Sequence, residues 1–188
     1  MRTTPTTKSS RPAAENAPSL LGRLRSQTPP RQLRLREALI VAERQAAALR
    51  LLTGTTEAYA FPLEELVDRA RLSVQEIMGL PVSGLSRWSG RQWHVAIAAG
   101  DALVRQRFTV AHEFKHILDH PRRDDLSEGQ VERVADHFAA CLLMPKRLVV
   151  LLWGQGIQDL EALAEQFEVS NAALRYRLHQ LRLLEPSR

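Results

Sequence analysis

Two histidines and a glutamate near the middle of the chain have the residue types and spacing of a metal-dependent hydrolytic site. His112 and His116 are four residues apart, so on a helix their side chains lie on one face and can bind the same metal ion. Glu113 follows the first histidine and would reach a water molecule at that metal, where it can act as a general base. A helix that carries such a site must bury its other face.

The apolar residues around this motif fall on one half of the predicted helix. They are Val104, Val110, Ala111, Phe114, Ile117 and Leu118. His112, Glu113 and His116 occupy the other half, within about 100° of one another. A solvated helix face normally carries Lys, Glu and Gln, so a histidine-rich face favours a metal site over the alternative of surface histidines.

A hydrolytic zinc site usually has three protein ligands, so a third ligand must lie elsewhere in the chain. The metzincin pattern would place a histidine six residues after His116, but that position is Arg122, and the glycine of the pattern is Asp119. That class of zinc peptidase is therefore excluded.

A second helix follows, in which two carboxylates lie four residues apart. Ser127 and Gln130 form a predicted capping box at its start, and Pro145 ends it. Glu132 and Asp136 lie along one edge of its apolar stripe, between core and solvent. We interpret Glu132 as the third zinc ligand and Asp136 as the carboxylate that orients a ligand histidine through its other ring nitrogen. The alternative is a solvated acidic pair on a helix flank.

The two helices together resemble the ImmA/IrrE family of bacterial metallopeptidases. The first block, Arg107 to His116, reads Arg-Phe-Thr-x-Ala-His-Glu-x-x-His, and the second, Glu132 to Pro145, reads Glu-x-x-Ala-Asp-x-Phe-Ala-Ala-x-Leu-Leu-Met-Pro. The resemblance covers residues 33–184. It implies one zinc ion per chain, held by His112, His116 and Glu132, with Glu113 as the catalytic base. It departs at Phe114 and Lys115, where the family commonly has an aliphatic residue and glycine; by helical spacing Lys115 points away from the ligands.

The resemblance also implies a function. Characterised relatives cut a helix-turn-helix transcriptional repressor at one site, and so release genes of mobile elements or stress responses. We therefore expect a regulatory zinc endopeptidase whose partner is a repressor substrate. Two alternatives stay open: a non-catalytic regulator that binds DNA or protein on a zincin scaffold, and an antitoxin-like partner. The substrate's identity, the activating signal, the oxyanion-stabilising residue and the oligomeric state are not indicated by the sequence.

Composition and charge divide the chain into three predicted parts. Residues 1–31 are rich in Thr, Ser, Pro and Arg and are expected to be a disordered basic tail. The first 36 residues carry eight Lys or Arg and one acid, so they hold more than the whole net charge of +5. Residues 32–150 form the predicted peptidase domain, and residues 151–188 a helix-turn-helix-like segment. With one cysteine, no secretory signal and no membrane-spanning stretch, we expect a cytoplasmic protein.

Periodicity predicts a mostly helical α+β fold, that of a minimal zincin with a small sheet. Helices are expected over 35–52, where Gly54 supplies the stop, and over 62–70; strands are expected over 74–78 and 93–98. Asp101 is the predicted N-cap of the active-site helix. We expect the strand over 93–98 to lie at the sheet edge and to pair with an extended substrate.

The C-terminal segment predicts two helices, over 159–167 and 170–183, that turn at Glu168, where helix-turn-helix units usually have glycine. From Gln155 onward the sequence contains four arginines and five acidic residues, so the segment has a net negative charge. That charge argues against DNA binding through 155–188, because a DNA-reading module must neutralise phosphates. Packing on the peptidase, or docking a protein substrate, is the expected role instead.

Three further histidines are not expected to bind metal. His94 falls on the surface of a predicted strand, and His120 lies at the helix end, where a histidine meets the helix dipole favourably. His137 points away from Glu132 and is expected at the surface, although a role as a transition-state donor stays open. Cys141 lies within an apolar run and is expected to be buried.

Overall fold

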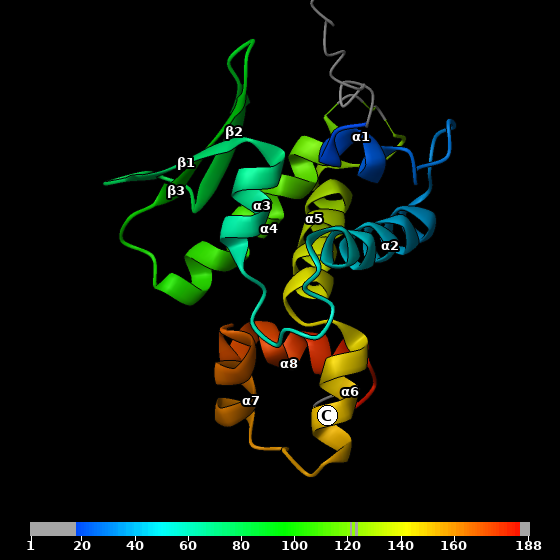
Figure 1. Cartoon of the computed structure of the whole chain (residues 1–188), viewed down its shortest axis with the longest axis vertical. Coiled ribbons are helices and arrows are strands. Elements are labelled where there is room, and N and C mark those ends of the chain that lie inside the picture. Colours follow the sequence, from blue (N-terminus) through cyan, green and yellow to red (C-terminus); the bar gives the residue numbers. More distant parts are fainter. Residues whose placement is uncertain (1–17, 121, 123, 185–188) are drawn as a thin grey trace, which may run out of the picture.

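The computed structural model describes residues 18–120, 122 and 124–184. Within these residues the chain forms eight helices and three strands, and Figure 1 shows the sheet lying to one side of the helices. In chain order the elements are α1 (Leu20–Arg25), α2 (Leu35–Thr53), α3 (Leu63–Ala70), β1 (Leu72–Ile77), β2 (Gly84–Trp88), β3 (Trp93–Ala98), α4 (Leu103–Asp119), α5 (Glu128–Leu143), α6 (Lys146–Gly154), α7 (Leu160–Phe167) and α8 (Asn171–Gln180). The predicted mostly helical α+β fold is confirmed.

The sheet has the strand order β1-β3-β2, with β1 parallel and β2 antiparallel to β3. The prediction that Trp93–Ala98 is an edge strand is therefore wrong, because β3 is paired on both sides. Val95, Ala96 and Ile97 are all buried, and because successive side chains point to opposite faces, this part of β3 is covered on both faces as well as paired at both edges. The edge strand that packs on α4 is β2, which the sequence analysis did not predict.

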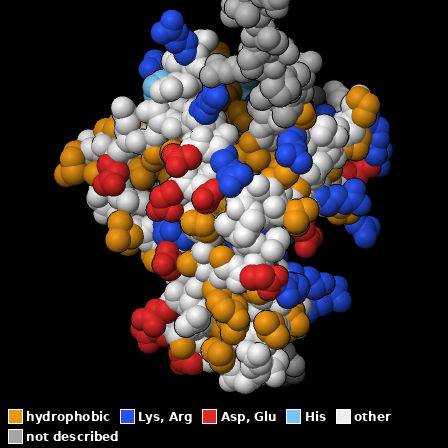
Figure 2. All heavy atoms as spheres, viewed as in Figure 1, with side chains coloured by type: hydrophobic (Ala, Val, Ile, Leu, Met, Phe, Trp, Pro, Cys, Tyr) orange, Lys and Arg blue, Asp and Glu red, His pale blue; other side chains and the backbone are white. Residues whose placement is uncertain are grey.

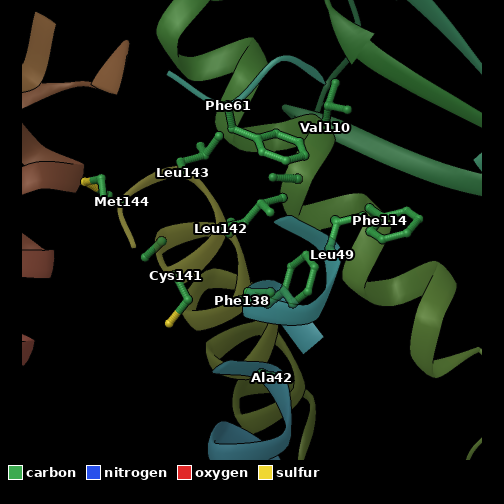
Figure 3. Close-up of a cluster of buried hydrophobic side chains, with 14 of the residues drawn as sticks. Ala42, Leu49, Phe61, Val110, Phe114, Phe138, Cys141, Leu142, Leu143 and Met144 are labelled. Atoms are coloured by element: carbon green, nitrogen blue, oxygen red, sulfur yellow. The ribbon is translucent and has the colours of Figure 1, made fainter. Parts of the chain in front are cut away.

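The core lies where α2, α4 and α5 pack together. Figure 3 shows Leu49 of α2, Phe114 of α4 and Phe138 of α5 directed into one cluster. All three side chains are fully buried, and the two phenyl rings lie 6.1 Å apart between centroids. Cys141 is buried in the same cluster, as predicted. Since α4 and α5 share this apolar seam, their relative position is fixed by packing that does not involve the histidines.

The start of α4 differs from the prediction. The N-cap is Ala102 rather than Asp101, and the Asp101 carboxylate instead lies 3.1 Å from Nε of Arg105 one turn later. Nε2 of Gln106 donates to the Ala98 carbonyl at 3.2 Å, which ties the helix to the end of β3. This short connection leaves α4 lying directly against the sheet.

The expectation of disorder over residues 1–31 does not hold for residues 18–31. Ser19 caps α1, Leu24 is fully buried, and the Arg25 guanidinium donates to the carbonyls of Ile117 and Leu118 at 2.7 and 3.2 Å. Carbonyls in the last turn of a helix have no partner within it, so this arginine stabilises the end of α4. Such contacts leave no periodic pattern in a short segment. Residues 1–17 of the expected tail lie outside the described residues.

The C-terminal helices pack on the rest of the protein. The boundary expected at residue 150 falls inside the continuous helix α6, and Figure 1 shows α6, α7 and α8 together at one end of the molecule. The buried side chains of α7 and α8, among them Phe167 and Leu178, belong to the same hydrophobic cluster as the core. Nε of Arg177 donates to the Met144 carbonyl at 3.0 Å, and Glu168 turns the chain with a left-handed φ of 52°. None of the described helices is long and apolar enough to cross a lipid bilayer.

Candidate active site

Helix α4 brings His112 and His116 to one point. Their Nε2 atoms lie 3.0 Å apart, and the centroids of their rings are 4.8 Å apart. The opposite face of the helix is buried through Val110, Phe114 and Ile117, so the helix cannot rotate without exposing its core. Both side chains are partly exposed, with 16% and 25% of their surface open to solvent. The pair therefore lies at the wall of an accessible site.

Helix α5 adds a carboxylate to this pair. Oε2 of Glu132 lies 3.2 Å from Nε2 of His112, and Oε1 lies 3.3 Å from Nε2 of His116. Donor atoms of the three residues all lie within 4.8 Å of one another, as ligands of one metal ion must. The predicted capping box holds the start of α5, where Oε1 of Gln130 accepts the backbone N–H of Ser127 at 3.0 Å. The three residues predicted as ligands are thus brought together.

Asp136 lies behind His112. Its Oδ1 is 2.9 Å from Nδ1 of His112, so the other nitrogen of the ring, Nε2, faces Glu132 and His116. Burial alone would lower the pKa of His112, but the hydrogen bond and charge of Asp136, helped by Glu132 and Glu113, raise it above its ordinary value. The position is the one predicted for a carboxylate that orients a metal-binding histidine.

Glu113 is buried beneath the edge strand. Only 7% of its surface is exposed, and its side chain packs against Gly84 at the start of β2. A Cβ at position 84 would overlap the Thr109 methyl group and lie 3.2 Å from Cγ of Glu113. The sequence analysis did not identify Gly84 as part of the site. A glycine just before a short alternating segment was the available signal, because glycine within a strand often marks a close backbone approach.

Lys115 lies away from the three ligand candidates, as its helical position predicted. Its side chain is buried between α4 and α2, where Nζ donates to Oε1 of Gln45 at 2.9 Å and to Oδ1 of Asp119 at 2.7 Å. Burial lowers the pKa of Lys115, and the charge of Asp119 opposes that change. This lysine therefore contributes to packing, and Asp119 compensates its charge on the side of α4 that faces away from the ligand candidates.

The remaining histidines lie outside the group of ligand candidates. His120 packs edge-on against Trp93 at 4.8 Å between centroids. His137 lies between α5 and α8: Nδ1 is 3.2 Å from Nε2 of Gln180, and Nε2 is 3.5 Å from Sγ of Cys141. That position joins two helices, so the structure offers no support for the possibility that His137 stabilises a transition state.

Two helices that bring three candidate metal ligands together, next to a small sheet whose edge strand covers the glutamate of His-Glu-x-x-His, define a zincin-like fold. The family model described as Peptidase_M78, IrrE N-terminal-like domain, matches residues 67–179, which is more than half of the chain and includes both helices. The protein belongs to this family of metallopeptidase-like domains.

One solved structure of similar fold is a Mycobacterium tuberculosis transcriptional regulator. The two chains share 21% sequence identity with a TM-score of 0.53, and the match covers 86% of this chain and 52% of that one. The chain thus spans about half the length of that regulator, and the likeness is one of fold. No curated protein matches the sequence.

Proposed function

We propose that this protein is a zinc-dependent endopeptidase of regulatory type. The observation that carries the proposal is the convergence of His112, His116 and Glu132 beside the buried Glu113. Membership of a peptidase family supports it, because the matched region includes all four residues.

The three side chains fit zinc by their chemistry. Two imidazole nitrogens and one carboxylate are a recurrent ligand set of hydrolytic zinc sites, in which a fourth position stays open. Zinc held by His112, His116 and Glu132 would supply a Lewis acid that lowers the pKa of a water molecule and polarises the substrate carbonyl. Asp136 would keep the proton on Nδ1 of His112, so that the lone pair of Nε2 stays available for binding.

Glu113 is the proposed catalytic base. Its carboxylate accepts a proton from the attacking water and then donates that proton to the nitrogen of the leaving amine. Contact with Gly84 holds the Glu113 side chain against the edge strand, which limits its freedom before the reaction begins. A scaffold without catalytic activity would not need a buried carboxylate in this position.

The outer edge of β2 is the proposed binding surface for an extended peptide. Among the described residues β2 pairs with β3 alone, so the backbone groups on its other edge have no strand partner. A peptide that adds to this edge passes beside Glu113, because Gly84 at the start of β2 lies against that residue. We therefore assign to β2 (Gly84–Trp88) the pairing with an extended substrate that was predicted for the strand over 93–98.

The proposed substrate is a helix-turn-helix transcriptional repressor cut at one site. This step rests on the family resemblance of the two motif blocks. The M. tuberculosis protein of similar fold is described as a transcriptional regulator, which agrees with a role in transcription control. A repressor substrate would place the reaction in the cytoplasm.

A non-catalytic regulator is the second candidate, and the helix-turn-helix-like pair α7 and α8 is the feature that favours it. Such a regulator would bind a partner protein or DNA through residues 155–188, and an antitoxin-like partner is a related case. The net negative charge from Gln155 onward makes a protein the better-matched partner. In this candidate Glu113 would be dispensable.

The metal content of the purified protein, followed by cleavage of the product of a neighbouring repressor gene, tests the proposal. We expect about one zinc ion per chain, as one three-ligand site requires, and its loss in Glu132→Ala. Glu113→Gln should keep zinc and lose cleavage, whereas His112→Ala should lose both. Cleavage by the Glu113→Gln protein at the wild-type rate would refute the role of Glu113. A wild-type protein that cannot be loaded with zinc would favour the scaffold.

A further inference from the structure

A hollow lies at the end of β2 that is distant from Glu113. It is a cavity of about 350 Å³ between the β2–β3 hairpin, α1 and the C-terminal end of α4. Three arginines and three aromatic side chains define its chemistry: Arg25, Arg71, Arg91, Trp88, Trp93 and His120. None of these residues belongs to the group of ligand candidates, so the cavity needs a separate explanation.

Strand β2 connects this cavity with the candidate active site. Gly84 at one end lies against Glu113, and Trp88 at the other end lines the cavity. The step from Gly84 to Trp88 covers about 13 Å of strand. The step from Glu113 to His120 gives an independent estimate of about 10 Å along the helix. The cavity thus lies about three or four residues of extended peptide from Glu113.

Strand register places the cavity and the active site on the same face of the sheet. Gly84 pairs with the buried Ile97 and Trp88 pairs with the buried Trp93, so Gly84, Ser86 and Trp88 lie on the face of β2 that is directed toward α4. A peptide added to the outer edge of β2 follows the same alternation. Every second side chain of the peptide would be directed toward α4, first near the ligand candidates and then at the cavity.

The cavity is positively charged. Among the residues that the structure describes, no Asp or Glu lines it, and none of Arg25, Arg71 and Arg91 forms an ion pair. Asp119 is close enough to act on Arg25, but its carboxylate already binds Lys115 at 2.7 Å. Figure 2 shows Lys and Arg side chains near the tip of the β2–β3 hairpin, with acidic side chains lower on the same face, over α3. An acidic ligand would be attracted to the hairpin end.

The walls of the cavity are partly fixed. Two backbone carbonyls at the end of α4 hold Arg25, as described above. Trp93 is buried, and the centroid of its ring lies 5.5 Å from that of the half-exposed Trp88. Arg71 and Arg91 are exposed, so their long side chains are able to close on a ligand. An anchored arginine, an aromatic wall and two adjustable arginines suit a carboxylate better than an apolar side chain.

We propose that this cavity is a specificity subsite that binds an acidic side chain of the substrate, three or four residues from the scissile bond. A guanidinium group can donate two parallel hydrogen bonds to one carboxylate, and the indole rings exclude water and so strengthen the ion pair. The subsite rests on the proposed peptidase function, because it assumes a peptide on the edge of β2.

Peptide binding tests the subsite without requiring cleavage. The probe is a set of ten-residue peptides of Ala, Ser and Thr in which each position in turn carries Glu, Gln or Lys. The full chain with Trp153→Phe retains two of its three tryptophans, Trp88 and Trp93, and both line the cavity, so their fluorescence reports binding there. Glu113→Gln is added to keep the peptides intact.

We expect Glu at one peptide position to bind about five- to tenfold more tightly than Gln. The double variant Arg71→Glu, Arg91→Glu should reverse the preference to Lys, which the loss of a merely structural role would not do. Arg87→Glu is the matched control, because Arg87 lies on the opposite face of β2 and should leave the preference for Glu intact.

Three results separate the subsite from the peptidase activity. Equal binding of the Glu, Gln and Lys peptides, or an unchanged preference in the double variant, would overturn the subsite. If the wild-type protein cleaved the repressor and gave either of these results, the proposed peptidase function would still be supported. A preference for Glu in a protein that cleaves no repressor would support the subsite as a peptide-binding feature and count against the peptidase.

Discussion

Gly84 of the edge strand lies against Glu113 of the active-site helix, and the space between them is smaller than a methyl group. A Cβ at position 84 would lie 3.2 Å from Cγ and 3.3 Å from Oε1 of Glu113, and would overlap the side chain of Thr109. The side chains of Thr109 and Glu113 are both buried, so neither can move aside easily to make space for that Cβ. The sheet and the proposed base are therefore positioned by direct contact.

Replacing Gly84 with alanine should lower activity without removing the metal. The strand or the Glu113 side chain must shift, and a displacement of about 1 Å can cost about a hundredfold in rate, so we expect kcat/KM to fall at least about tenfold. Zinc content and repressor cleavage are measured on the same preparation. Gly100→Ala is the control, because nothing lies within 4 Å of a Cβ there. Full activity of Gly84→Ala would show that the contact does not position Glu113.

Asp136→Asn should weaken metal binding while the fold survives. The amide would no longer accept a charged hydrogen bond from Nδ1 of His112, which is 2.9 Å from Oδ1 of Asp136 in the structure. Loss of such a partner typically lowers metal affinity about 10- to 100-fold. Competition with a chromophoric chelator measures the change, and Asp68→Asn, an exposed aspartate of α3, serves as the control. Equal zinc affinity in the two variants would contradict the role of Asp136.

The residues of the candidate metal site could be predicted because each pair lies within one helix. His112 and His116, like Glu132 and Asp136, are four residues apart, so helical geometry alone places each pair on one face. The apolar stripes of α4 and α5 then determine which faces meet. The packing of Phe114 on Phe138 is one of the tertiary contacts that bring these faces together.

The parts that could not be predicted depend on contacts between distant segments. Which strand lies at the edge is decided by pairing between β1 and β3, residues 72–77 and 93–98, and local alternation does not encode that pairing. The helix α1 depends on the hydrogen bonds that Arg25 donates to carbonyls at the end of α4. An arginine in a segment rich in Ser, Pro and Arg gives no sign of such a partner.

His137 should make stability sensitive to acid. Burial, followed by the charge of Arg177 and a smaller effect of Arg133, lowers the pKa of His137, while Glu43 and the hydrogen bond with Gln180 oppose the change. As the pH falls below about 6.5, the unfolded chain binds a proton that the folded chain does not, so the free energy of unfolding decreases.

The variant His137→Gln isolates this effect. At pH 7.5 it should be less stable than the wild type by about 1 kcal/mol, because the contact with Gln180 is weakened. At pH 5 the difference should shrink, since glutamine has no proton to gain. Urea unfolding at the two pH values measures both differences, and the other histidines cancel in the comparison. A difference that stays constant or grows toward pH 5 would contradict the prediction.

Leu24→Ala tests whether α1 belongs to the folded core or, as composition suggested, to a disordered tail. Leu24 is fully buried in the main hydrophobic cluster, and Nε2 of Gln45 donates to its carbonyl at 3.1 Å. A buried leucine truncated to alanine typically costs about 2–5 kcal/mol of unfolding free energy, measured here by urea unfolding. Leu51→Ala, at a residue that is 70% exposed on α2, should cost less than about 0.5 kcal/mol. Equal losses in the two variants would mean that α1 is detached in solution, and the arginine that completes the proposed subsite would detach with it.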